Sequence, residues 1–188
     1  MNIYDFDNTI FLGDSSVKFF WYSLFRYPII VLISVFKALF ESIKYIFKRS
    51  SFGLIKSELY SYVKYIDDLD KFIEKFVNKN MKNIKVFYKQ IKRDDDVIIS
   101  ASFDFIVRPF CERLGLKYII CTKYDTKNGI IIGKNNKGEE KIVRFKEIFG
   151  DVVVENAYSD SLSDIPMFNI AKRAYLVKGE KLIDYKTK

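Results

Sequence analysis

The chain has 188 residues, 49% of them hydrophobic and 30% charged, which fits one folded domain with an insertion and excludes an intrinsically disordered chain. The absence of histidine excludes Ser-His-Asp and Cys-His nucleophile pairs and HExxH zinc sites. Lysine and arginine number 32 against 24 acidic residues, a net charge of +8. This charge is compatible with nucleic acid, with an anionic membrane surface, or with a compositional bias towards lysine.

Short apolar runs predict the strands of a buried sheet. They lie at 2–7, 96–100, 118–121, 152–154 and 174–177, and helical patterns separate the later ones at 105–114, 139–149 and 163–171. Alternating strands and helices favour a parallel α/β sheet covered on both faces. In such sheets, ligands bind beyond the carboxyl ends of the strands.

Residues 15–93 interrupt this alternation. They contain no convincing strand and show helical patterns at 29–47, 57–66 and 70–91. The simplest interpretation is a helical insertion after the first strand.

The two cysteines, Cys111 and Cys121, lie in apolar patterns without metal-ligand spacing. We expect buried free thiols in a reducing cytoplasm, and we identify no secretory signal.

The first strand ends in Asp5-Phe6-Asp7-Asn8-Thr9. Residues two apart in an extended strand point to the same side, so both carboxylates can address one ligand. The alternative is a loop that caps the next helix.

Three further positions carry candidate chemistry. Ser100 ends a strand and could donate to a phosphate oxygen, or it could cap a helix. Lys141 opens a helical pattern and could equally be a surface lysine. Asp160 and Asp164 follow the 152–154 run and could complete a site for a hard cation, or be a capping residue and a surface residue.

In this order, the four elements resemble the signature of the haloacid dehalogenase superfamily, and the resemblance spans essentially the whole chain. The block from Ser100 to Phe105 and the approach to Lys141, Gly-Glu-Glu-Lys, are similar to subfamily IB, which includes phosphoserine phosphatases. Within it, the chain most resembles the phosphatidylglycerophosphatase C-like branch at Gly13-Asp14-Ser15, Val107-Arg108-Pro109 and the 160–164 segment. Ser159 departs from the family pattern, which usually has glycine there.

The resemblance implies a Rossmann-like, three-layer parallel-sheet core with an inserted helical-bundle cap of the C1 type. The core domain would comprise residues 1–13 and 94–188, and the cap domain residues 14–93.

The resemblance also implies site roles. Asp5 would be the nucleophile that forms an aspartyl-phosphate, and Asp7 the general acid and base. Mg²⁺ would be held by Asp5, the Asp7 carbonyl and Asp160, while Asp164 would lie at the edge of that shell and order Lys141. Thr9, Ser100, Ala101 and Lys141 would hold the substrate phosphate. Asp14 lies where phosphoserine phosphatases place an acidic residue towards the substrate amine.

The apolar composition of the insertion is relevant to the class of substrate. Its charge-free stretch, 27–36, is too short to span a bilayer. Two interpretations remain open: a helix buried in the insertion, or a helix lying in the membrane interface between basic residues and aromatic anchors.

We therefore expect a Mg²⁺-dependent phosphomonoesterase in the cytoplasm, with peripheral contact to the inner face of the membrane as a further expectation. The favoured substrate is a phospholipid phosphate such as phosphatidylglycerophosphate, and the alternative is a small soluble phosphomonoester such as phosphoserine. A non-catalytic phosphate-binding or membrane-binding module is the alternative of another class. Scattered basic residues disfavour a nucleic-acid partner, and the sequence does not indicate an oligomeric state.

Overall fold

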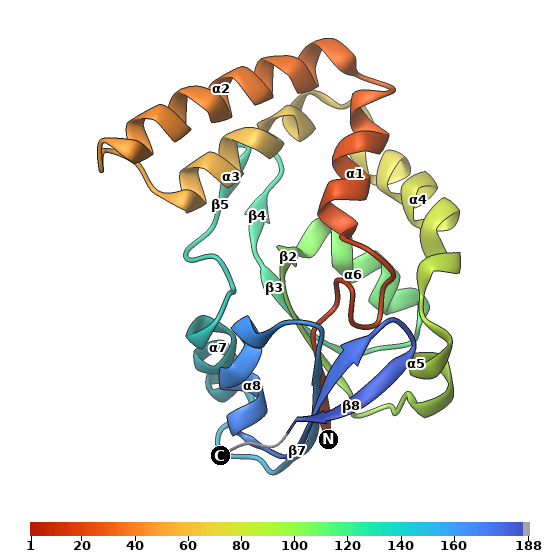
Figure 1. The fold of residues 1–188 in the computed structure, drawn as a ribbon. Helices are drawn as coiled ribbons and strands as arrows, with labels where there is room; N and C mark the ends of the chain where they lie inside the picture. The colour runs from red at the N-terminus through yellow and green to blue at the C-terminus, as the bar shows by residue number, and fades with distance from the viewer. Residues whose placement is uncertain (186–188) are drawn as a thin grey trace.

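The structure, a computed structural model, describes residues 1–185, and its framework is a six-stranded sheet in the order β3-β2-β1-β6-β7-β8 (Figure 1). The strands are β1 (Asn2–Tyr4), β2 (Val97–Phe103), β3 (Tyr118–Thr122), β6 (Val154–Ser159), β7 (Ala171–Lys178) and β8 (Lys181–Tyr185). All neighbours pair in parallel except β7 and β8. The parallel α/β sheet predicted from the apolar runs is confirmed.

Each face of the sheet is covered because alternate strand residues point to opposite sides. Tyr4 and Ile98 join one apolar cluster with α6 (Asp104–Arg113) and α5 (Val86–Ile91). Ile3 and Val97 join a second cluster with α7 (Glu139–Phe149) and α8 (Ile165–Asn169). The chain is therefore a three-layer α/β protein, as the resemblance implied, and both cysteines are buried free thiols.

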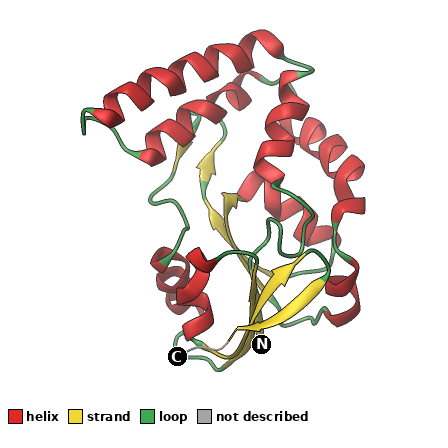
Figure 2. Cartoon of the chain, in the orientation of Figure 1, coloured by secondary structure: helices red, strands yellow, loops and turns green. Residues whose placement is uncertain are grey.

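Helices fill the chain between β1 and β2 (Figure 2). They are α1 (Ser15–Leu24), α2 (Pro28–Ile46), α3 (Phe52–Tyr60), a 3₁₀ turn (Ser61–Tyr65), α4 (Leu69–Asn80), a second 3₁₀ turn (Met81–Asn83) and α5. We call residues 15–91 the helical insertion.

Two predicted helical stretches differ from the structure. The 70–91 stretch is broken between α4 and α5, because the backbone there bonds to the loop after β1: Leu12 N donates to Asn83 O and Lys85 N to Ile10 O, each over 2.8 Å. The 57–66 stretch begins earlier, at Phe52, where the Ser51 hydroxyl accepts from Leu54 N, and it tightens into a 3₁₀ turn after Tyr60. In the sheet, the strand predicted at 152–154 begins only at Val154.

The insertion does not have an apolar core of its own. Phe19, Phe72 and Phe76 belong to the same cluster as Tyr4 and Ile98 of the sheet. A hairpin, β4 (Tyr124–Asp125) and β5 (Ile130–Ile131), also leaves the core to meet α3, where Ile131 N donates to the Ser57 hydroxyl over 2.9 Å. The division into residues 1–13 plus 94–188 and 14–93 stays a prediction, and 186–188 lie outside the described residues.

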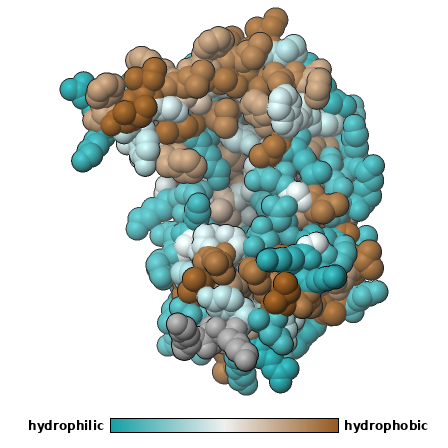
Figure 3. Space-filling model, in the orientation of Figure 1, coloured by the Kyte–Doolittle hydropathy of each residue, from teal (hydrophilic) through white to brown (hydrophobic). Residues whose placement is uncertain are grey.

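The surface of α2 is unusually apolar. Figure 3 shows hydrophobic side chains gathered along the helix at the top of the molecule. Large residues such as Ile29, Phe36 and Ile46 are exposed there, while Val31, Ser34 and Ala38 face inwards. Within residues 1–185, no helix combines the length and apolar composition needed to cross a membrane.

Candidate active site

The predicted site residues converge where β1, β2 and β6 end. In the sheet, β1 lies between β2 and β6. After β1 the chain continues into β2 on one side of β1, and it later returns to form β6 on the other side. Ligand crevices form at such switch points. A pocket of about 360 Å³ lies there, and its lining includes these predicted residues: Asp5, Asp7, Asp14, Ser100, Ala101, Lys141, Asp160 and Asp164.

Asp5 lies at the centre of the site. Lys141 Nζ donates to Asp5 Oδ1 over 2.7 Å and to Asp164 Oδ2 over 2.8 Å. Among residues 1–185, Asp5 Oδ2 accepts a single hydrogen bond, a long one from the Thr9 hydroxyl over 3.4 Å. Burial raises the pKa of Asp5 to about 7, although the Lys141 ammonium opposes that change. Lys141 itself is only 2% exposed, and the two carboxylates raise its pKa against the lowering effect of burial.

Asp7 is held by the start of the insertion and by β2. Its Oδ1 accepts from Ser15 N over 2.6 Å, and its Oδ2 accepts from the Ser102 hydroxyl. Burial raises the pKa of Asp7, and the carboxylate of Asp14 adds to that rise. A protonated Asp7 is a form that can act as a proton donor.

The loop that carries Asp7 is braced from the insertion. Asn8 has a left-handed backbone, φ 54°, and its carbonyl accepts from Lys85 Nζ. Asn8 N donates to Gly13 O over 3.0 Å, and Gly13 has φ 91°, where a Cβ would lie only 2.8 Å from Lys18 Cε. The loop therefore depends on residues that tolerate positive φ.

The segment after β6 brings two carboxylates to the same pocket. Thr9 Oγ1 accepts from Asp160 N over 3.0 Å, which fixes the start of the segment against the Asp5 loop. Burial raises the pKa of the Asp160 carboxyl. The Ser159 hydroxyl donates to Asp164 Oδ2 over 2.7 Å, so the serine that replaces the usual glycine helps to orient the partner of Lys141.

Ser100 and Ala101 line the same pocket as Asp5. Ser100 Oγ accepts from Ser102 N over 3.0 Å, and Ser100 O accepts from Asn136 Nδ2 over 2.9 Å. Ala101 O accepts from the Thr122 hydroxyl over 2.8 Å. These bonds hold an irregular part of β2, where the pairing with β3 shifts register. The Ser100 hydroxyl proton remains available to an anion in the pocket.

Sequence reasoning missed several residues of the site. Lys56 of α3 donates from Nζ to Ala101 O over 2.8 Å and to Asn135 Oδ1 over 3.0 Å, and burial lowers its pKa to about 8. Lys137 also lines the pocket. Ser102 could have been found, because it shares a strand face with Ser100. No sequence signal separates Lys56 from the other lysines.

The donor set fits a hard divalent cation. The pocket is lined by five aspartates and by three lysines, Lys56, Lys137 and Lys141, so carboxyl groups outnumber ammonium groups around an entering phosphate. A dianionic phosphate would be repelled unless a cation accompanied it. Among residues 1–185, no three acidic or cysteine side chains form a complete metal site. Mg²⁺ often uses only one or two protein carboxylates and completes its shell with water and phosphate.

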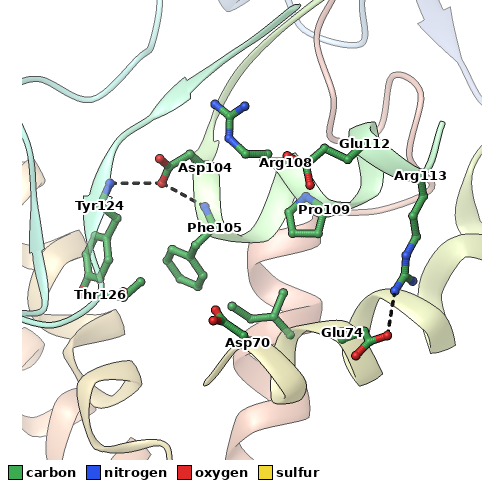
Figure 4. Close-up of a pocket in the computed structure, with 11 residues that line it drawn as sticks. Asp70, Glu74, Asp104, Phe105, Arg108, Pro109, Glu112, Arg113, Tyr124 and Thr126 are labelled. Carbon is green, nitrogen blue, oxygen red and sulfur yellow. Dashed lines mark hydrogen bonds and ion pairs between the residues drawn. The ribbon is translucent and has the colours of Figure 1, made fainter. Parts of the chain in front are cut away.

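A second pocket, of about 580 Å³, lies beside α6 (Figure 4). It contains none of the predicted site residues. Asp104 Oδ1 accepts there from Phe105 N and Tyr124 N over 2.9 and 3.2 Å, and Arg113 lies 3.8 Å from Glu74. Three of the six charged residues of this pocket are thus engaged in the fold, and the predicted site residues lie elsewhere, so we place the candidate chemistry in the smaller pocket.

Comparison with known proteins identifies the family of the chain. Residues 3–169 match the family model described as haloacid dehalogenase-like hydrolase. Protein CicA of Caulobacter vibrioides is 38% identical over 81 residues, which cover 40% of this chain and 36% of CicA. The matched segment therefore spans little more than a third of that curated relative.

Two solved structures share the fold. A protein of unknown function from Bordetella pertussis Tohama I has a TM-score of 0.73 and 18% identity, covering 94% of this chain and 88% of the other. A phosphoserine phosphohydrolase-like protein from Francisella tularensis subsp. tularensis SCHU S4 has a TM-score of 0.58 and 17% identity, covering 94% and 87%. At these identities, the likeness is one of fold.

Proposed function

The chain belongs to the haloacid dehalogenase-like hydrolase family, and from this premise we propose that it is a Mg²⁺-dependent phosphomonoesterase that works through an aspartyl-phosphate. The observation that carries the proposal is the buried contact of Lys141 with Asp5 and Asp164, at 2.7 and 2.8 Å. A carboxylate nucleophile needs no histidine to activate it, which suits a chain that has none.

Asp5 attacks the phosphorus atom through a carboxylate oxygen, and the bond from phosphorus to the leaving oxygen breaks. Asp7 donates its proton to that oxygen, so the alcohol leaves neutral. In the second step, Asp7 accepts a proton from water as the water oxygen attacks the phosphorus of the aspartyl-phosphate. Inorganic phosphate leaves, and the Asp5 carboxylate is restored.

The other residues of the pocket bind and orient the phosphate. Lys141 and the Ser100 hydroxyl would donate to its oxygens and offset the charge that develops in the transition state. Asp5, Asp160 and the Asp7 carbonyl would hold Mg²⁺. The bound ion would neutralise the carboxylates and polarise the phosphoryl group. Asp164 would orient Lys141 through the ion pair and would be oriented by Ser159.

The favoured substrate is a phospholipid phosphate such as phosphatidylglycerophosphate. The insertion contributes apolar side chains to the pocket rim, and two of them, Val17 and Phe52, are 49% and 58% exposed. Such a rim suits a substrate with apolar chains better than a free amino acid. We propose that the enzyme works in the cytoplasm, with peripheral contact to the inner face of the membrane.

One observation favours the alternative, a small phosphomonoester with an amine, such as phosphoserine. Asp14 lines the pocket, and its Oδ1 caps α1 by accepting from Val17 N over 2.8 Å. Its Oδ2 accepts no hydrogen bond from residues 1–185 and could receive a substrate ammonium.

The test compares phosphate release from phosphatidylglycerophosphate in mixed micelles with release from phosphoserine, each with Mg²⁺ and with EDTA. We expect Mg²⁺-dependent turnover of both classes to be measurable, with the lipid preferred in kcat/KM. Preference for phosphoserine would contradict the favoured substrate. Absence of turnover with phosphomonoesters would contradict the proposed activity and favour a non-catalytic binding module.

A further inference from the structure

Helix α2 packs with its small side chains and exposes its large apolar ones. Val31, Ser34 and Ala38 recur at helical spacing and are buried. Ser34 Oγ lies 3.2 Å from Ser61 Oγ in the turn after α3. The opposite side of α2 is apolar along its length, and we call it the docking face: Ile29, Leu32, Ile33, Phe36, Leu39, Phe40, Ile43, Ile46 and Phe47.

This distribution is the reverse of that in an ordinary surface helix, which turns its apolar stripe towards the core. Phe36 is 70% exposed, Phe40 60% and Ile46 76%. Figure 3 shows hydrophobic side chains gathered over α2. An exposed apolar patch of this extent marks an interaction surface.

Charge identifies the partner. Beside Phe36 and Phe40, helix α3 contributes the carboxylate of Glu58 to a shared pocket. Four basic residues, Lys37, Lys44, Lys48 and Arg49, lie in α2 or directly after it, against one carboxylate of α2 itself. That carboxylate, Glu41, is neutralised by Lys44 Nζ at 2.6 Å and also accepts from the Ser50 hydroxyl over 2.7 Å. An apolar face with a basic border matches an anionic bilayer, whose surface attracts cations and whose interior accepts apolar side chains.

We propose that α2 lies in the interface of an anionic lipid bilayer and docks the protein there through this face. A second copy of the chain is disfavoured as the occupant, because two such faces would bring their basic borders together. The helix lies along the membrane surface, since Lys37, Glu41 and Lys44 lie in its middle.

One helix, α3, connects the docking face with the catalytic pocket. Helix α3 packs along the inner side of α2, and it contributes Phe52, Lys56 and Tyr60 to the pocket lining. Docking through α2 thus holds the pocket close to lipid head groups. The placement of the pocket near head groups deepens the proposed function and rests on it, whereas the docking of α2 does not depend on the proposed catalytic activity.

The test is co-sedimentation with vesicles of phosphatidylcholine alone and of phosphatidylcholine with phosphatidylglycerol. Wild-type protein should bind the anionic vesicles at least about tenfold more tightly than the neutral ones. The double variant Phe36→Gln/Phe40→Gln should lose at least about tenfold in affinity for anionic vesicles, because it removes two large apolar contacts. The matched control, Val143→Gln/Ile148→Gln, alters two exposed apolar residues of α7 and should bind as wild type.

Two further measurements separate the alternatives. Hydrolysis of a soluble aryl phosphate by Phe36→Gln/Phe40→Gln should equal that of wild type, so loss of vesicle binding is not loss of fold or chemistry. Equal vesicle binding by wild type and this variant would overturn the proposal. A wild-type dimer that the variant converts to a monomer, without vesicle binding, would also overturn it in favour of a second copy.

Discussion

The sheet core and the helical insertion distribute their charged and apolar residues in opposite ways. At the carboxyl edge of the core, Asp5, Lys141 and Asp164 are almost fully buried and held by short contacts. In the insertion, Phe36 and Phe40 of α2 are mostly exposed. Buried, oriented charge is what a chemical step requires, and exposed apolar surface is what recognition requires. We infer that the core carries the chemistry and that the insertion selects where and on what it acts.

The largest expected effect is that of Asp5→Asn in the core. The variant keeps the shape of the side chain and removes the nucleophilic carboxylate, so kcat should fall by at least about 10³-fold. Phosphate release measured at saturating Mg²⁺ checks this, with Asp151→Asn as the exposed control. Near wild-type turnover by Asp5→Asn would contradict the proposal that Asp5 of the core is the nucleophile.

Lys141→Gln should have the next largest effect and should change two quantities. Loss of the ammonium from the phosphate site should lower kcat/KM by about 10²–10³-fold. Leaving Asp5 and Asp164 buried without their cation should also lower the free energy of unfolding by about 3–5 kcal/mol. Urea denaturation and steady-state kinetics measure both, with Lys146→Gln on the outer side of α7 as the control. Unchanged stability would show that the contacts of Lys141 do not support the fold.

Lys56→Gln tests whether the insertion contributes to substrate binding in the site. Lys56 reaches the Ala101 carbonyl from α3, so its loss should weaken substrate binding more than the chemical step. We expect KM to rise about tenfold and kcat to change by less than about threefold. Lys75→Gln, on the exposed side of α4, is the control. A fall in kcat with unchanged KM would contradict the inference that the insertion contributes to substrate binding and not to the chemical step.

Asp96→Asn tests a buried carboxylate of the core that lies away from the pocket, at the start of β2. Its carboxylate accepts from Arg93 N over 2.9 Å and from Asn2 Nδ2 over 3.3 Å, and burial raises its pKa to about 6. The folded state therefore resists ionisation of Asp96, and this group lowers stability as pH rises from about 4 through 6.

The asparagine variant does not titrate, so its stability relative to wild type should increase over that range, by up to about 3 kcal/mol. Urea denaturation at several pH values measures the difference, and Asp184→Asn is the exposed control. kcat should not change. A constant stability difference between the variant and wild type would contradict the buried, raised-pKa assignment.

The core was predictable because its signals are local. Apolar runs mark buried strands; Asp5 and Asp7 end the first run, and Asp160 directly follows β6, whose start the 152–154 run marks. Strand β8 was missed because its sequence, Lys-Leu-Ile-Asp-Tyr, carries the charges that an edge strand tolerates. The β4–β5 hairpin was missed because its two-residue strands depend on contacts with α3.

The insertion was less predictable because its arrangement depends on distant contacts. The break between α4 and α5 is set by hydrogen bonds to the loop at Ile10 and Leu12, and no proline or glycine marks it. In α2, apolar residues occur on the packed side and on the exposed side, so the sequence could not tell one side from the other. The contact of Lys56 with Ala101 joins residues 45 positions apart and leaves no local signal.

The central claim is that Asp5 becomes phosphorylated. Rapid mixing of the protein with a ³²P-labelled phosphomonoester and Mg²⁺, followed by acid quenching, should yield a hydroxylamine-sensitive phosphoprotein that maps to the peptide containing Asp5. Asp7→Asn should accumulate more of it with an activated aryl phosphate, because the base for the second step is missing, and Asp5→Asn should form none. Turnover without any phosphoprotein, or label on Asp5→Asn, would contradict the account.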